Sequence, residues 1–173
     1  MGKRSSFERR EGDRWATPRE AVEPLLPHLT GIKTFAEPCC GDGDLVRHLE
    51  DAGLRCPWSS DISGGQDALD IDDFGPVDAI ITNPPYTRKV MHAMIDHFST
   101  IAPTWLLIEF DWTATQQAQP FMPLCSHIVI VGRLRWMPGT KNKGKENFAW
   151  CRFDATHTGD TIFLNQGRRR NDS

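Results

Sequence analysis

The sequence contains no long hydrophobic run. No stretch of its 173 residues approaches the roughly 18 apolar residues that a membrane-spanning helix needs, which excludes a membrane bundle. The charges in the first six residues are not followed by an apolar segment, so we expect no secretory signal. There is no internal repeat and no low-complexity segment, and hydrophobic residues make up 39% of the chain. This composition excludes a collagen or a largely disordered protein and is typical of a globular domain.

Cysteine is present but forms no metal-binding pattern. The five cysteines are Cys39, Cys40, Cys56, Cys125 and Cys151. Their number is odd and no two have the Cys-x-x-Cys spacing, so we expect neither a metal site nor a disulfide framework. Reduced thiols are typical of a cytoplasmic protein. At roughly 150 residues per domain the chain makes one domain, which can bury a core without disulfides.

Negative and positive charges are segregated along the chain. Residues 41–80 hold ten acidic residues and two arginines, whereas residues 132–147 hold five basic residues and one acidic residue. The basic residues of that second segment are Arg133, Arg135, Lys141, Lys143 and Lys145. Such an asymmetry would allow the protein to hold an organic cofactor on one side and a polyanion on the other. Ordinary solvated loops are the alternative explanation.

The hydrophobic pattern predicts alternating strands and helices. Seven strands are expected at residues 33–37, 55–59, 77–82, 105–110, 126–131, 148–153 and 161–164, the last two as a closing hairpin. Helices are expected at residues 17–28, 45–52, 88–101 and 114–122, the first beginning with the capping box Thr-Pro-Arg-Glu. The pattern indicates one α/β domain over residues 15–165 with a mostly parallel sheet. A flexible arm at residues 1–14 and a flexible basic tail at residues 166–173 would flank it.

A glycine-containing turn, Glu-Pro-Cys-Cys-Gly-Asp-Gly at residues 37–43, joins the first strand to a helix. Gly41 and Gly43 would let the backbone approach a ligand closely. Val46 replaces the third glycine of the dinucleotide-binding fingerprint, so a pyrophosphate cofactor is disfavoured. The acidic residues of the turn suit a cationic or hydroxyl-rich ligand instead. Asp61 follows about 20 residues later, where such folds hold a ribose.

A second turn, Asn-Pro-Pro-Tyr at residues 83–86, ends the strand expected at residues 77–82. Its prolines fix φ and remove two N–H donors, which leaves the Asn83 side-chain oxygen and the Pro84 carbonyl as acceptors. These acceptors can bind both hydrogens of an exocyclic amine, and Tyr86, the one tyrosine of the chain, offers a ring for stacking. Ligands of such sheets bind at the carboxyl ends of the strands, so both turns should face one site.

These turns resemble those of the S-adenosylmethionine-dependent amino-methyltransferases, and more narrowly the DNA adenine-N6 methyltransferases of small, phage type. The catalytic signature of that family, Asp/Asn/Ser-Pro-Pro-Tyr/Phe/Trp, is matched by Asn83, Pro84, Pro85 and Tyr86. The family's cofactor loop is similar to residues 37–43 and its threonine-proline element to residues 15–18, in the gamma-type order. The resemblance covers residues 15–165. It implies a Rossmann-like class I methyltransferase fold with a mostly parallel seven-stranded sheet and a C-terminal antiparallel hairpin.

The resemblance also implies a cofactor, S-adenosylmethionine, and the residues that bind it. Glu37 would accept from the amino group of the cofactor, Asp61 from its ribose hydroxyls and Asp67 from its adenine amine. The full set of implied cofactor-binding residues is Thr17, Pro18, Glu37, Pro38, Cys39, Gly41, Gly43, Asp61, Asp67 and Ala68.

For the substrate, the resemblance implies that the turn at residues 83–86 binds an adenine flipped out of DNA, with Tyr86 stacked on the base. Phe148, followed by Trp150 in the same expected strand, would form a second aromatic wall; packing of that strand into the core is the alternative. The five basic residues of segment 132–147 would bind DNA phosphates, which makes duplex or single-stranded DNA the expected partner.

Several alternatives stay open. The same chemistry could act on RNA, on cytosine N4 or on protein glutamine, and the chain could be a catalytically silent nucleic-acid-binding subunit. A nicotinamide enzyme is disfavoured by the missing third glycine. The enzymes that the sequence resembles usually carry a separate target-recognition region, for which this chain has no room. Either the basic loop reads a short site, or specificity is low, or a partner subunit supplies it. We expect a cytoplasmic enzyme of a bacterium or a phage-infected host.

Overall fold

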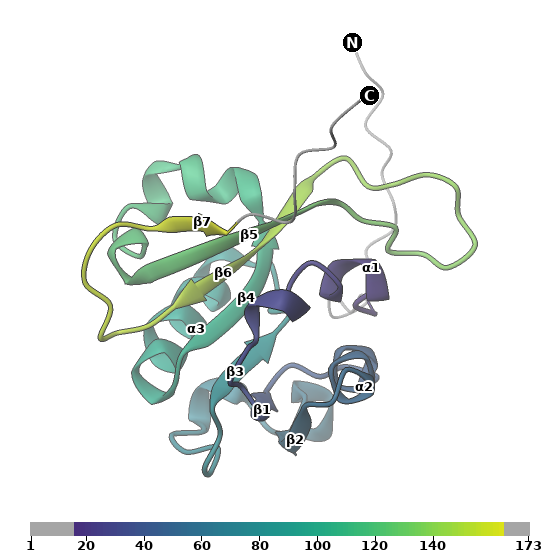
Figure 1. Cartoon of the computed structure of the whole chain (residues 1–173). Helices are drawn as coiled ribbons and strands as arrows, with labels where there is room; N and C mark the ends of the chain where they lie inside the picture. Colours follow the sequence, from purple (N-terminus) through teal and green to yellow (C-terminus); the bar gives the residue numbers. More distant parts are fainter. Residues whose placement is uncertain (1–15, 165–173) are drawn as a thin grey trace.

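The computed structural model describes residues 16–164, so the arm expected at residues 1–14 and the tail expected from residue 166 lie outside the described residues. The described chain forms one sheet of seven strands in the order β2-β1-β3-β4-β6-β5-β7 (Figure 1). The strands are β1 (Thr34–Glu37), β2 (Arg55–Ser59), β3 (Ala79–Thr82), β4 (Thr104–Glu109), β5 (Cys125–Arg133), β6 (Asn147–Phe153) and β7 (Ile162–Leu164). All seven expected strands are therefore present.

Strand pairing divides the sheet into two halves. β2, β1, β3 and β4 pair in parallel, whereas β6 pairs antiparallel with both β4 and β5, and β7 pairs in parallel with β5. The antiparallel hairpin is thus β5–β6, and the prediction that the last two strands pair with each other was wrong. The burial of the strands explains the difference. β6 is buried on both faces and needs an interior position, whereas Ile162 and Phe163 of β7, each 55% exposed, suit an edge.

Helices and turns cover both faces of the sheet. The short α1 (Arg19–Val22) and α2 (Asp44–Asp51) lie on one face, and α3 (Arg88–Ile101) lies on the other (Figure 1). Successive residues of β4 point to opposite layers: Leu107 packs with the α1 and α2 side, and Leu106 with the α3 side. In the described part of the chain, no helix is both long and apolar enough to span a membrane.

The first helix is much shorter than expected. α1 ends at Val22, and a 3₁₀ turn at Leu26–His28 follows, because Pro24 and Pro27 supply no N–H to continue the helical bonds. The predicted capping box was also wrong. Pro18 occupies the cap position and no side chain caps the helix. The hydroxyl of Thr17 bonds to a residue after β3 instead.

The helix expected at residues 114–122 is absent as well. The chain forms three 3₁₀ turns there, at Phe110–Ala114, Gln116–Ala118 and Met122–Leu124. The hydroxyls of Thr113 and Thr115 donate to backbone carbonyls three residues earlier, at 2.7 Å each, and compete with helical bonding. Pro120 removes a further N–H donor. By contrast, α3 begins and ends at the expected residues.

Candidate active site

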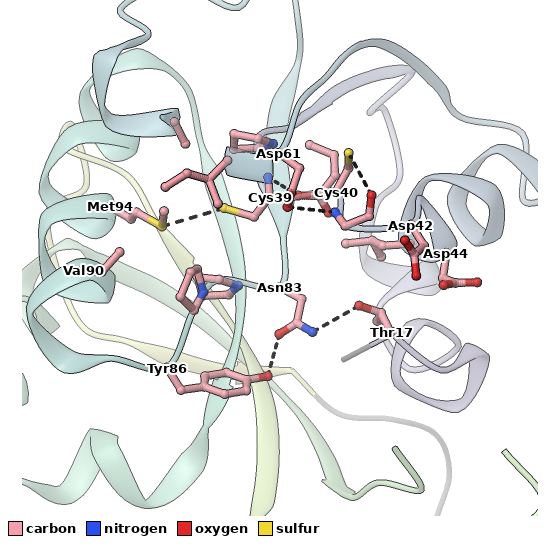
Figure 2. Close-up of a pocket in the computed structure, with 18 of the residues that line it drawn as sticks. Thr17, Cys39, Cys40, Asp42, Asp44, Asp61, Asn83, Tyr86, Val90 and Met94 are labelled. Carbon is pink, nitrogen blue, oxygen red and sulfur yellow. Dashed lines mark hydrogen bonds between the residues drawn. The ribbon is translucent and has the colours of Figure 1, made fainter. Parts of the chain in front are cut away.

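A cavity of about 230 Å³ opens at the carboxyl ends of β1, β2 and β3 (Figure 2). The turn after β1, the segments around Asp61 and Asp67, and the turn after β3 form its wall, together with Ala16 and Thr17 in front of α1. In Figure 2, Asp42 and Asp44 lie on one side of the cavity, whereas side chains of α3 lie on the other. An acidic wall opposite an apolar one suits an organic ligand that carries a ring together with amino or hydroxyl groups.

Most of the residues expected to bind a cofactor lie on this wall. Those on the wall are Thr17, Glu37, Pro38, Cys39, Gly41, Asp61, Asp67 and Ala68. The other two, Pro18 and Gly43, which immediately precede α1 and α2, do not line the cavity. All four residues of the turn at 83–86 also line the cavity. The two turns that the sequence singles out therefore meet at one site.

The glycine turn owes its shape to backbone conformation. Gly41 and Gly43 have φ values of +50° and +83°, in the left-handed region that other residues rarely adopt. An added Cβ at Gly41 would meet no atom within 4 Å, so it is the backbone angle rather than lack of space that favours glycine there. The N–H of Gly41 donates to Asp61 Oδ2 at 3.2 Å, which ties the turn after β1 to the end of β2.

Asp61 and Asp67 are held in place by nearby polar groups. Asp61 Oδ1 accepts from the backbone N–H and the hydroxyl of Ser63, at 3.0 and 2.6 Å. Asp67 Oδ1 accepts from the N–H of Leu69 at 3.0 Å. Both carboxylates therefore face the cavity in fixed positions, as an acceptor for ligand hydroxyl or amino groups should.

Glu37 is buried at the inner end of the cavity. Only 1% of it is exposed, and its Oε1 bonds to the hydroxyl of Thr82 and to the N–H of Cys39, the latter at 2.9 Å. Burial, and to a smaller extent the nearby Asp61 charge, raise the pKa of Glu37 to about 8, although the two hydrogen bonds oppose the rise. At neutral pH this carboxyl is therefore mostly protonated until a cationic group approaches it.

The turn at residues 83–86 places an amide between two hydroxyls. Asn83 Nδ2 donates to Thr17 Oγ1 at 3.2 Å, and Asn83 Oδ1 accepts from the Tyr86 hydroxyl at 2.5 Å (Figure 2). Pro84 is buried and Pro85 is half-buried, and neither has an N–H. The result is a rigid turn whose polar atoms belong to side chains and carbonyls.

Three aromatic rings pack together beside this turn. The Phe148 ring of β6 lies 5.6 Å from the Tyr86 ring, and Trp136 lies 5.0 Å from Phe148 and 6.5 Å from Tyr86, measured between centroids. We call these residues the aromatic cluster. Phe148 is buried beneath Tyr86 and does not itself line the cavity. Trp150 lies within the core and donates from Nε1 to the carbonyl of Ala21 at 2.7 Å, so it belongs to the support of α1.

The loop between β5 and β6 projects away from the sheet (Figure 1). The N–H of Gly144 donates to the carbonyl of Leu134 at 2.8 Å and closes the loop at its base. The exposed basic residues of the segment are Arg133, Arg135, Lys141, Lys143 and Lys145. Arg135 is tied to α1, because its backbone N–H and its guanidinium both bond to the carboxylate of Glu20, at 2.6 and 3.1 Å.

Neither a scan against protein-family models nor a search of curated proteins finds a match. Solved structures do. A proposed RNA methyltransferase from Pyrococcus horikoshii has a TM-score of 0.56 at 16% identity, over 82% of this chain and 86% of the other. The modification subunit of a proposed type I restriction enzyme from Vibrio vulnificus has a TM-score of 0.55 at 14% identity, over 91% and 49%. A proposed class I S-adenosylmethionine-dependent methyltransferase from Listeria monocytogenes has a TM-score of 0.53 at 11% identity, over 86% and 65%.

The chain has the fold of the class I methyltransferases.

This class I methyltransferase fold confirms the fold expected from the sequence. At identities of 11–16% the likeness concerns the fold and not the reaction. The chain also spans only about half of the Vibrio subunit and 65% of the Listeria protein.

Sequence reasoning missed the α3 side chains Val90 and Met94, which line the cavity, and Trp136, which packs against Tyr86 and Phe148 beside it. The segment around Trp136 was interpreted from its charges alone. The sequence does contain one indication of its role: Trp136 is an aromatic residue between Arg135 and a proline-glycine turn at residues 138–139. Within residues 16–164, no group of three or more His, Cys, Asp or Glu side chains is arranged to hold a metal ion.

Proposed function

We propose that this chain transfers the methyl group of S-adenosylmethionine to the N6 amine of adenine in DNA. The observation that carries the proposal is the position of the turn at residues 83–86. It brings Asn83, Pro84 and Tyr86 to the same cavity that the glycine turn and Asp61 enclose. A ligand-binding cavity that also contains two amine acceptors and a stacking ring suits transfer to an exocyclic amine.

The residues present fit the proposed cofactor. Asp61 would accept from the ribose hydroxyls and Asp67 from the adenine amine, since both carboxylates are already fixed on the wall. Glu37 would accept from the amino group at the methionine end. When bound, S-adenosylmethionine supplies a methyl group on a positively charged sulfur, which an amine can attack directly.

The target amine is a poor nucleophile because its lone pair is delocalised into the ring. Asn83 Oδ1 and the carbonyl of Pro84 would accept its two hydrogens out of the ring plane. A more pyramidal nitrogen can then direct its lone pair at the methyl group, so the residues act by orientation and by fixed dipoles. No strong base is needed, because the proton becomes acidic once the nitrogen carries the methyl group.

The aromatic cluster and the basic loop would hold the nucleic acid. A duplex hides the adenine amine, so the base must leave the stack, and Tyr86 would stack on it in the cavity. Exposed residues such as Lys141 and Lys143 would bind phosphates. The fold does not choose between DNA and RNA. The loop would recognise a short DNA sequence unless a partner subunit supplies that recognition. The reaction would take place in the cytoplasm.

The decisive experiment gives the purified protein S-adenosylmethionine and three substrates: unmethylated duplex DNA, single-stranded DNA and RNA. Each product is digested to nucleosides and analysed by mass spectrometry. We expect N6-methyladenine in DNA, and far less of it with Asn83→Ala. Methylated RNA, N4-methylcytosine or methylated protein glutamine would each replace the proposed substrate. If the protein binds both S-adenosylmethionine and nucleic acid but no methylated nucleoside is found, the result would support the catalytically silent binding subunit.

Cofactor binding is tested separately by calorimetry. Asp61→Ala should weaken S-adenosylmethionine binding by about 10- to 100-fold, the scale of losing hydrogen bonds to a charged group. Asp72→Asn changes an exposed carboxylate that does not line the cavity and is the matched control. Equal affinities of all three proteins would contradict the proposed cofactor site.

A further inference from the structure

The two oxygens of the Glu37 carboxyl have different surroundings. The backbone N–H of Cys39 donates to Oε1 at 2.9 Å, and the hydroxyl of Thr82 bonds to the same oxygen. Neither bond uses Oε2, and Glu37 lines the cavity. One oxygen of this carboxyl is therefore held by the protein, and the other can accept from a ligand.

Thr82 comes from the strand next to Glu37. β1 ends at Glu37 and β3 ends at Thr82, and the two strands pair in parallel, so their last residues meet at the carboxyl edge of the sheet. Thr82 is fully buried and does not line the cavity. A buried hydroxyl is costly unless it forms a hydrogen bond, and valine would fill this strand position without that cost. The bond to Glu37 is the use that the structure shows for this hydroxyl.

The other groups around Glu37 do not favour its ionised form. Asp61 carries a negative charge that raises the pKa of Glu37. The neighbouring thiols stay neutral at physiological pH, because burial raises the pKa of each of them: Cys39, Cys40 and Cys56. The hydrogen bonds from Thr82 and Cys39 oppose the rise, and that of Thr82 is the stronger of the two. An ionised carboxylate can only accept, so the Thr82 hydroxyl must donate to it.

We propose that Thr82 is a positioning residue that holds the ionised Glu37 carboxylate ready for the amino group of S-adenosylmethionine. This inference rests on the cofactor of the proposed function. When the cationic amino group binds, the carboxyl proton of Glu37 leaves for the solvent. The carboxylate then accepts from Thr82 through Oε1 and from the ligand through Oε2, while Thr82 itself touches no ligand.

The test compares two substitutions of threonine by valine. Thr82→Val removes the hydroxyl and keeps the shape of the side chain. Thr104→Val in β4 is the matched control, since Thr104 is equally buried and its hydroxyl donates to the uncharged carbonyl of Ala102 at 2.9 Å. Thr82→Val should weaken S-adenosylmethionine binding at neutral pH by about 10- to 100-fold, the scale of one hydrogen bond to a charged group. Thr104→Val should leave it unchanged.

A second ligand and two further variants locate the effect. Methylthioadenosine has the adenosine part of the cofactor but not its amino acid, so its affinity should be similar in Thr82→Val and wild type. Thr82→Ser keeps the hydroxyl and should restore most of the affinity for S-adenosylmethionine. Thr82→Ala adds no atom to the core and should lose as much affinity as Thr82→Val.

The titration of Glu37 separates positioning from a general loss of structure. In NMR spectra of protein with isotope-labelled glutamate, the carboxyl resonance that Glu37→Gln removes should titrate at a pH of about 8 in wild type. In Thr82→Val it should titrate at higher pH, because the ionised form has lost a donor. In the Glu37→Gln background, Thr82→Val should change the affinity for S-adenosylmethionine no more than a few-fold.

Equal losses of affinity in both backgrounds, equal losses for both ligands, or an unchanged titration would overturn the inference and leave the proposed function standing. A wild-type protein that binds S-adenosylmethionine but methylates no adenine would contradict the proposed function alone. A wild-type protein that does not bind S-adenosylmethionine would overturn the proposed function and the inference with it.

Discussion

The cofactor end and the target end of the cavity are held together by different kinds of contact. At the cofactor end, carboxylates bond to groups near them in the chain or at the end of a neighbouring strand: Asp67 to Leu69, Asp61 to Ser63 and Gly41, and Glu37 to Thr82. At the target end, the contacts join distant elements. Thr17 bonds to a residue 66 positions later, and Tyr86 packs against rings from β6 and from the loop before it.

This difference separates two properties of the site. Turns that are fixed by their own backbone keep their shape when a distant side chain changes, so the cofactor end should tolerate substitutions at the target end. The target end depends on side chains from several elements, and any one of them can misplace the others. Substitutions there should affect the reaction without affecting cofactor binding.

The largest effect is expected from Asn83→Ala. The rate of methyl transfer should fall by about 100- to 1,000-fold, as it does when one preorganised polar group is removed from a transition state. Affinity for S-adenosylmethionine should stay close to that of wild type, since the carboxylates of the cofactor end are untouched. Single-turnover rates with labelled cofactor and calorimetry measure the two properties. A variant that no longer binds the cofactor would show that the two ends are not separate.

Trp136→Ala should have the next largest effect. Trp136 does not line the cavity but packs against Tyr86, on which the base would stack. Stacking of a base on an aromatic ring contributes ~1–3 kcal/mol, so loss of this support should weaken binding of the flipped base by up to about 100-fold. The fluorescence of 2-aminopurine placed at the target position reports flipping directly. Trp136→Phe keeps a ring in the aromatic cluster and should keep most of the binding. Wild-type flipping in Trp136→Ala would mean that Tyr86 and Phe148 suffice.

The pH dependence tests the cofactor end through Glu37. Its pKa is raised by burial to about 8, so the folded protein holds this proton more tightly than the unfolded chain. The resulting stabilisation is complete below the ordinary pKa of 4.5 and is lost as the pH rises through about 8. The free energy of unfolding should therefore fall over this interval in wild type, and less so in Glu37→Gln.

Cofactor binding should respond in the opposite direction. A cationic amino group favours the ionised carboxyl, so affinity should rise by about tenfold as the pH increases by one or two units towards 8, with release of a proton. Calorimetry in buffers of different ionisation enthalpy measures the number of protons released on cofactor binding. Glu146→Gln, in the exposed loop, is the control. The same pH profile in Glu37→Gln would assign the effect to another group.

The smallest effect is expected at the surface of the basic loop. Replacing Lys141 and Lys143 together by serine should weaken DNA binding modestly. It should also reduce the slope of log K against log salt by about 0.9 for each phosphate that the loop no longer binds. Lys33→Ser, outside the loop, should leave the slope unchanged. Binding titrations at several salt concentrations measure it, and an unaltered slope in the double variant would remove the loop from the DNA interface.

The sequence was sufficient for features that depend on neighbours in the chain. α3, the seven strands and the two turns at the edge of the sheet follow from local periodicity, proline and glycine. It was insufficient where one side chain has two compatible uses. Thr17 fits a helix cap, yet its hydroxyl bonds to Asn83. No feature of the sequence near Thr17 predicts that partner. Likewise, β6 could have paired with β7, and only its burial on both faces decides otherwise.

The hydrogen bond between Gly144 and Leu134 closes a loop of residues 135–143. Trp136, near the start of this loop, packs against Phe148, whereas Lys141 and Lys143, near its end, are exposed. Exchange of the exposed residues between Trp136 and Gly144 should therefore alter the end of the loop more than the rings beside the cavity. Under the proposed function, the target preference of the protein would then be changed by replacing a few loop residues, with the cavity left as it is.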